Sequence, residues 1–274
     1  MARLLKEHPV EELTYKPSPR RVRGELGGEI VVDSRGALVV WEPGKPVPLY
    51  AFPAADVSAN ALRAAEPPDD QSHPDAAEWW DLHAGERTER HAAWRYEDPD
   101  LTEAIAIRWS ALDRWFEEDE EVFVHPRDPH TRVDALQSGR HVRVELEGQV
   151  LAESTRPFLV FETNLPVRYY LPREDVRLER LTSSAKHTAC PYKGVASYWS
   201  ADVGGRTHDD IAWTYPDPIR EAPQLTDLVC FFNERTDITV DGEAVGRPEN
   251  HWSPGIRENL RGGLSGTGTP SRGS

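Results

Sequence analysis

The sequence contains very little sulfur and no long hydrophobic run. Only two cysteines and one methionine occur among 274 residues. Cys190 and Cys230 cannot form a disulfide framework, and we expect both to be reduced thiols. No run of about 18 apolar residues is present, as a membrane-spanning helix would require, and Met1–His8 lack the apolar stretch of a secretory signal. These absences predict a cytoplasmic protein without a membrane partner.

Basic residues are also scarce relative to acidic ones. The chain has 32 Lys and Arg residues against 47 Asp and Glu residues, a formal net charge of −15. This charge repels phosphate backbones and anionic lipid, so we expect no nucleic-acid partner. The hydrophobic share of 38%, together with 19 glycines, is typical of a folded globular chain.

The chain repeats itself. Arg21–Gly28 matches His141–Gly148, and the order of matching residues then continues through each half. The clearest later matches are Leu38–Glu42 with Phe158–Glu162 and Trp94–Pro99 with Trp213–Pro218. Ordered matches over this length indicate a duplication. The sequence therefore predicts two homologous domains.

Composition suggests where these domains begin and end. His125–His130 contains two prolines, and polar residues continue to Gly139, which is typical of a linker. The last residues are rich in Gly, Ser, Thr and Pro, which predicts disorder. We expect an N-terminal arm (1–20), a first repeat domain (21–124), a linker (125–140), a second repeat domain (141–250) and a disordered tail (251–274).

Most of each repeat has a β pattern. Val142, Val144 and Leu146 alternate with charged residues, as in a half-buried strand. Gly204-Gly205 separates two β-rich segments, 196–203 and 211–215, and indicates a hairpin. Strands at such short spacing predict two compact antiparallel-sheet domains.

One amphipathic helix is predicted in each repeat. The expected fold class is therefore α+β, with mainly β structure. In the first repeat, Asp98 can cap a helix that Pro99 begins. An apolar stripe at helical spacing would then face the core. The stripe consists of Leu101, Ile105, Trp109, Leu112 and Phe116 in the first repeat, and of Leu225, Leu228, Val229 and Phe232 in the second.

The two repeats differ where reactive side chains occur. In the second repeat the segment His187–Trp199 contains an imidazole, a thiol and an amine. When the repeats are superposed, Pro68, Gln71, His73 and Pro74 occupy the positions of His187, Cys190, Tyr192 and Lys193. The reactive set is thus complete in one copy only. The first domain is expected to carry a degenerate site and to serve as a structural or pocket-covering partner.

These residue types suggest a small-molecule site, with Cys190, His187 and Lys193 as candidate catalytic residues. A thiol near an imidazole and an ammonium group can have its pKa lowered and become a nucleophile. Aromatic faces for a flat or cationic ligand come from Tyr192, Tyr198, Trp199, Trp213 and Tyr215.

Three other interpretations of this segment remain open. In the first, Cys190 is a small buried hydrophobe, His187 caps a turn and the aromatic residues fill a core. In the second, the protein is a non-catalytic sensor or scaffold whose aromatic residues only bind. In the third, both domains serve assembly alone. The sequence does not define an oligomeric state.

The string His-Thr-x-Cys-Pro-Tyr-Lys-Gly-x-Ala-x-Tyr-Trp, followed by Trp-x-Tyr-x-Asp-Pro, resembles an uncharacterised bacterial family catalogued as domain of unknown function 427. The chain is similar to its tandem members over roughly residues 15 to 250. The resemblance implies a tent-like β fold, related to methionine sulfoxide reductase B and cereblon-type ligand-binding domains. It implies no established activity.

Metal-dependent chemistry is not favoured. The family has been labelled nucleotidyltransferase-like, a chemistry that needs two metal-binding carboxylates on a strand. Asp98 and Asp100 have the spacing, but they open the predicted helix and recur in the second copy only as Asp217. Two separate cysteines cannot build a four-cysteine zinc site. We therefore expect neither a metal site nor a cofactor.

Overall fold

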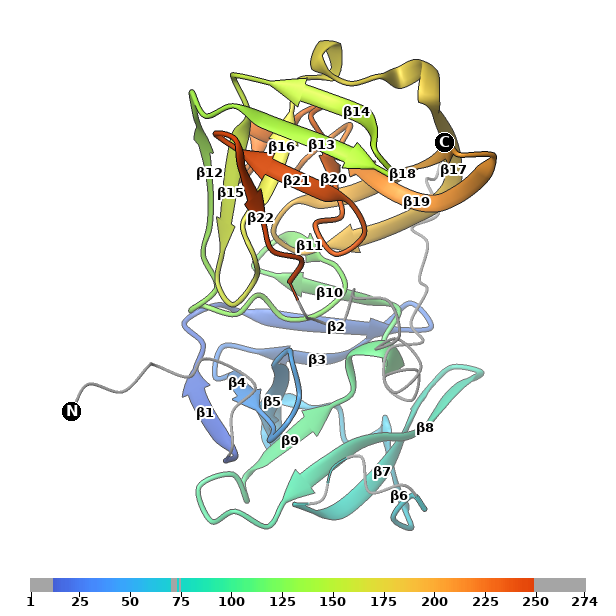
Figure 1. Cartoon of the computed structure of the whole chain (residues 1–274). Helices are drawn as coiled ribbons and strands as arrows, with labels where there is room; N and C mark the ends of the chain where they lie inside the picture. Colours follow the sequence, from blue (N-terminus) through green and yellow to red (C-terminus); the bar gives the residue numbers. More distant parts are fainter. Residues whose placement is uncertain (1–11, 70–72, 74, 249–274) are drawn as a thin grey trace, which may run out of the picture. The chain divides into compact units, whose positions relative to one another are not determined.

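The computed structural model describes residues 12–69, 73 and 75–248 (Figure 1). The chain divides into two compact units, which meet in the sequence at Pro129 and His130. Both units are built almost entirely from antiparallel strands, which confirms the predicted two-domain β architecture. The predicted disordered tail, 251–274, and residues 1–11 of the predicted arm lie outside the described residues.

The first domain contains a seven-stranded and a four-stranded sheet. The larger sheet has the strand order β1 (Thr14–Pro17), β4 (Leu38–Trp41), β5 (Leu49–Pro53), β9 (Ala104–Ile107), β8 (Arg87–Tyr96), β7 (Ala76–Ala84) and β6 (Leu62–Ala65). The smaller sheet has the order β11 (Glu120–Val122), β10 (Arg114–Glu117), β2 (Val22–Leu26) and β3 (Glu29–Ser34).

The second domain repeats this topology strand for strand. Its larger sheet has the order β12 (Val133–Gln137), β15 (Phe158–Glu162), β16 (Arg168–Leu171), β20 (Val229–Phe231), β19 (Arg206–Thr214), β18 (Gly194–Val203) and β17 (Leu181–Cys190). Its smaller sheet has the order β14 (Gln149–Ser154), β13 (Val142–Leu146), β21 (Asp237–Val240) and β22 (Glu243–Val245). The predicted hairpin around Gly204-Gly205 is formed by β18 and β19.

Local details show that the duplication extends to individual hydrogen bonds. Ser34 Oγ donates to Asp56 Oδ2 over 2.6 Å, and Ser154 Oγ donates to Asp175 Oδ2 over 2.7 Å. The register of β2 and β3 shifts after Gly24, as does the register of β13 and β14 after the matching residue. The two domains can therefore be compared position by position.

The central strands of the larger sheet are buried on both faces. In the second domain, one face packs against the smaller sheet through residues such as Leu171, Val229 and Phe231. The opposite face packs under the segment that follows β19, through residues such as Tyr170 and Cys230. We call the cluster on this opposite face the outer cluster. Its ten buried members are Val160, Tyr170, Ala196, Tyr198, Trp213, Tyr215, Ala222, Leu225, Cys230 and Phe232.

The predicted amphipathic helices are wrong. The described residues contain no α-helix, only five 3₁₀ turns: η1 (Ala54–Asp56), η2 (Trp109–Ala111), η3 (Arg173–Asp175), η4 (Leu178–Arg180) and η5 (Pro223–Leu225). The first stripe is divided among a turn, β9, η2 and β10, and the second among η5, a turn and β20.

The physical reason is that β9 and β20 are central strands buried on both faces. Ile105 and Ile107 belong to the cluster on one face of the sheet, whereas Ala104 and Ala106 belong to the cluster on the other. A strand of this kind is apolar at every position, so it also supplies apolar residues at helical spacing. The fold class is therefore mainly β without the helical component.

Among the residues that the structure describes, no helix has the length and apolar character needed to cross a membrane.

Candidate functional site

The predicted site segment in the second domain forms a β-hairpin. Cys190 ends β17 and pairs with Gly194 at the start of β18, so Pro191, Tyr192 and Lys193 make the connection. Gly194 has a φ of +104°, a backbone conformation that favours glycine. A Cβ at this position would lie 3.2 Å from the carbonyl oxygen of Asp217. The hairpin tip is thereby held against the segment that follows β19.

This hairpin separates His187 from Cys190. Residues three apart on a strand lie on opposite faces, because successive side chains alternate. His187 is exposed, and its Nδ1 lies 3.3 Å from Ser197 Oγ. Cys190 is half-buried and packs against the outer cluster. The pairing of His187–Cys190 with Gly194–Ser197 is regular, so this alternation holds along the whole stretch.

Lys193 does lie near Cys190, but its ammonium group is engaged elsewhere. Lys193 Nζ forms an ion pair with the carboxylate of Glu162, at the end of β15. Both side chains are more than nine-tenths buried. Burial raises the pKa of the Cys190 thiol, the Lys193 charge lowers it, and the Glu162 charge raises it. Burial is the largest of these effects, so the protonated thiol is favoured.

The aromatic residues fall on both faces of the sheet. Tyr198, Trp213 and Tyr215 belong to the outer cluster and are each less than a tenth exposed. Trp213 Nε1 donates to Tyr170 Oη over 3.0 Å. Trp199 lies against the opposite core cluster, and the Arg173 guanidinium lies 5.3 Å from its ring centroid. Tyr192 is half-buried at the hairpin tip.

The structure thus brings together part of the predicted set. Cys190, Tyr198, Trp213 and Tyr215 share one cluster. Burial raises the pKa of Tyr215 well above its ordinary value, and the charges of Tyr170, Cys190 and Glu162 add to this rise. Lys193 and Cys190 are close enough to interact electrostatically. His187 and Trp199 lie on the other face.

Sequence reasoning missed the glutamate of this site. The repeat matches Glu162 with Glu42 of the first repeat, but nothing in the sequence pattern marks either glutamate as a site residue. In the first domain, Glu42 is buried and its two carboxylate oxygens lie 2.7 and 2.8 Å from His73 Nδ1. Tyr96 Oη donates to Glu42 Oε1 over 2.7 Å. The first domain therefore keeps a buried glutamate with a basic partner, although it lacks the thiol and the lysine.

A cavity of about 600 Å³ lies beside this part of the first domain. Its lining includes Pro43, which follows Glu42, and Glu97, which follows Tyr96. The lining also includes Glu12, Leu13, Asp75 and Asp98. The equivalent segments of the second domain pack closely, since Ile219 N donates to the carbonyl of Lys193 over 3.2 Å.

The carboxylates considered for nucleotidyl transfer lie on a turn. Asp98 and Asp100 are exposed in the segment between β8 and β9, and Asp98 Oδ1 accepts a hydrogen bond from the Asp100 backbone over 2.9 Å. In the part of the chain that the structure describes, no group of three or more His, Cys, Asp or Glu residues is placed to hold a metal ion.

Comparison with known proteins identifies a family but no characterised relative. No curated protein matches the chain. A family model described as a domain of unknown function, DUF427, matches twice, over residues 14–118 and 134–242. These ranges contain most strands of the two repeats, all but β11 and β22 and the first residue of β12, and they cover most of the sequence. The chain belongs to the DUF427 family, as a tandem member with two copies of the domain.

Proposed function

We propose that this protein binds a small polar ligand without catalysing a reaction, at the hairpin tip of the second domain. The observation that carries the proposal is the buried Lys193–Glu162 ion pair. Burying two charges costs several kcal/mol per ion, on the order of what the pairing returns, so such pairs are weak contributors to stability. A pair of this kind is better explained by binding than by stability alone.

The first domain supports this interpretation, because a different basic residue lies beside its equivalent glutamate. His73, rather than a lysine, lies beside the buried Glu42. His73 also comes one position earlier in the superposed repeats, yet it reaches the equivalent carboxylate. A basic partner has thus been kept at this glutamate by two different residues. Drift in a redundant copy would more simply remove both charged groups.

The chemistry of the pair indicates the class of ligand. Glu162 accepts hydrogen bonds and Lys193 donates them, while the pair as a whole is neutral. A neutral molecule with a donor and an acceptor side by side, such as an amide, matches this arrangement. Tyr192, half-buried at the tip, offers a face on which a flat molecule can stack. The proposed ligand is therefore a flat molecule that carries an amide group.

The thiol-enzyme alternative is less well supported. The Lys193 charge lowers the pKa of Cys190, which favours it, but burial outweighs this effect. His187 faces away from the thiol and offers no base to it. Cys190→Ser separates the two functions, because a binding protein retains its affinity in this variant whereas a thiol enzyme loses turnover.

Benzamide is a suitable probe of the binding site. Titration of the full chain, followed by amide ¹H–¹⁵N spectra, is expected to shift the amide resonances of Cys190, Tyr192, Lys193 and Gly194. The double variant Lys193→Met with Glu162→Met removes both charges without leaving either alone, and it should abolish these shifts. Lys186→Met is the matched control, because Lys186 lies on the same hairpin but pairs with Asp210. Benzamide shifts that persist in the double variant, or that are missing from the wild type, would refute the proposal.

A further inference from the structure

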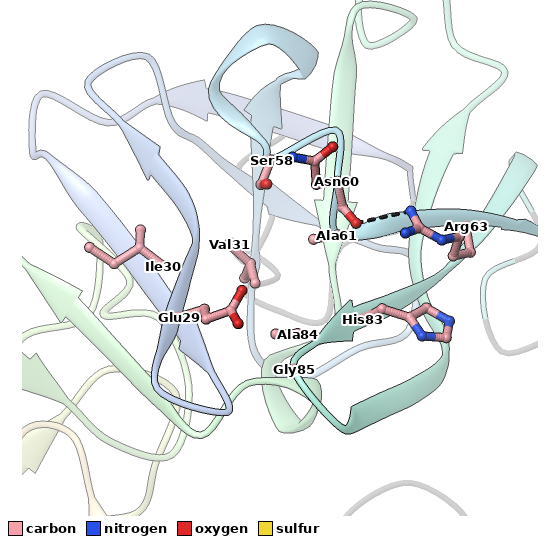
Figure 2. Close-up of a pocket in the computed structure, with 10 residues that line it drawn as sticks. All are labelled: Glu29, Ile30, Val31, Ser58, Asn60, Ala61, Arg63, His83, Ala84 and Gly85. Atoms are coloured by element: carbon pink, nitrogen blue, oxygen red, sulfur yellow. Dashed lines mark hydrogen bonds between the residues drawn. The ribbon is translucent and has the colours of Figure 1, made fainter.

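A second cavity lies in the first domain, where β3 and the β7–β8 hairpin face the segment between η1 and β6 (Figure 2). Its volume is about 160 Å³, roughly ten times the space that one water molecule needs. Pockets for drug-sized ligands are roughly 300–1,000 Å³, so this cavity suits a molecule the size of an amino acid. Ala61 and Ala84, both almost fully buried, form an apolar part of its wall.

Opposite charges line the two sides of this cavity. Figure 2 shows Glu29 on one side and Arg63 with His83 on the other. The Glu29 carboxylate has no hydrogen bond or ion pair to any residue in the described ranges. Arg63 Nη1 donates to the carbonyl oxygens of Asn60 and Leu62, each over 2.9 Å, which holds its guanidinium at the rim. The cavity therefore has a negative and a positive end.

The second domain shows which group fits beside Glu29. The backbone at this position is the same in both domains. Ala61 N donates to the Ser58 carbonyl, and Arg180 N donates to the Arg177 carbonyl, over 2.9 Å in each case. Arg180 thus stands where the first domain has Ala61.

The Arg180 side chain makes a contact that the first domain lacks. Its Nη1 donates to Gln149 Oε1 over 3.2 Å. Gln149 occupies the position of Glu29, since both begin the second strand of the matching hairpin. The second domain therefore places a guanidinium of its own beside this side chain. In the first domain the alanine leaves the space open, and a carboxylate replaces the amide.

We propose that the first-domain cavity binds a small zwitterion with a guanidinium group, of the size and charge of free arginine. The guanidinium pairs with Glu29, as Arg180 pairs with Gln149 in the second domain. The carboxylate of the ligand lies toward Arg63. A guanidinium matches a carboxylate with two parallel hydrogen bonds, which an ammonium group cannot do. This site is separate from the proposed benzamide site, which lies in the other domain.

L-Arginine is the probe for this cavity, and calorimetric titration of the full chain measures both affinity and stoichiometry. We expect one arginine per chain. Citrulline, which has a neutral urea in place of the guanidinium, and agmatine, which lacks the carboxylate, should each bind about tenfold more weakly or worse. Equal binding of citrulline would refute the guanidinium assignment, and equal binding of agmatine would refute the role of Arg63.

Two sets of variants locate the site. Ala61→Arg supplies the first domain with the second domain's own guanidinium and should abolish arginine binding. Glu29→Gln, at an exposed position, should weaken arginine binding by about tenfold or more. If Ala61→Arg does not fold, this variant still tests whether arginine binds beside Glu29. Conversely, the second domain has Thr182 at the position of Arg63, so Arg180→Ala and Gln149→Glu combined with Thr182→Arg should raise the stoichiometry from one to two.

Failure of the arginine proposal can be distinguished from failure of the benzamide proposal, because the two sites lie in different domains. Lys193→Met with Glu162→Met lies in the other domain and should leave arginine binding unchanged. Wild-type affinity in both Ala61→Arg and Glu29→Gln, or no binding at millimolar arginine, would overturn the proposal.

Discussion

The buried ion pair of the second domain gives the sharpest test of the structure. Lys193→Met removes the ammonium group but keeps most of the aliphatic side chain, so Glu162 is left buried without its partner. The side chains of Lys193 and Glu162 are 9% and 7% exposed, so this is a buried ion pair. Breaking such a pair typically costs about 3–5 kcal/mol, whereas exposed pairs contribute about 0–1 kcal/mol. We therefore expect the second domain to lose about 3–5 kcal/mol of unfolding free energy.

Two further variants separate charge from packing. The double variant Lys193→Met with Glu162→Met should regain most of the loss, because neither charge is then buried alone. Arg206→Met is the matched control, since the Arg206 side chain is 70% exposed in its pair with Glu147. Its loss should stay below about 1 kcal/mol.

Urea unfolding of the full chain measures these differences. Amide resonances of each domain should be followed separately, because two domains need not unfold in one transition. A loss below about 1 kcal/mol in Lys193→Met, equal to that of the exposed control, would show that the pair is not buried as described. An equal loss in the single and double variants would show that packing, rather than the unpaired charge, is responsible.

Three other predictions concern the thiols and the hairpin tip. Because burial raises the pKa of Cys190, its reaction with a disulfide reagent at pH 8 should be slower than that of free cysteine, and a faster reaction would contradict the placement of this thiol. Burial raises the pKa of Cys230 to about 12, so the free energy of unfolding should fall as pH rises above 9, by about 1.4 kcal/mol at pH 10. The folded state retains its proton in this range while the unfolded thiol ionises, and Cys230→Val should remove this part of the pH dependence measured by urea titration. Gly194→Ala would place a Cβ within 3.3 Å of three backbone atoms, whereas a Cβ at Gly205 meets nothing within 4 Å. Gly194→Ala should therefore destabilise the second domain more than Gly205→Ala does. Equal thermal midpoints of the two variants would argue against the close packing at the hairpin tip.

The sequence by itself determined the duplication and most of the strands. Alternation at Val142, Val144 and Leu146 specifies one buried face, and the glycine pair after Val203 specifies a turn, because both are local properties of the chain. The helices were predicted wrongly for a reason that is also local. A strand buried on both faces, such as β9, is apolar at every position and therefore satisfies helical spacing as well.

Only the tertiary structure decided which polar groups meet. The regular pairing of β17 with β18 turns a spacing of three residues into opposite faces, so His187 and Cys190 are apart. Lys193 meets Glu162, 31 positions earlier in the chain, because the hairpin tip folds over the end of another strand. Likewise, the space beside Glu29 exists because Ala61, distant in sequence, occupies the place where the second domain has Arg180. Contacts of this kind depend on how strands pack together, and no local pattern in the sequence specifies them.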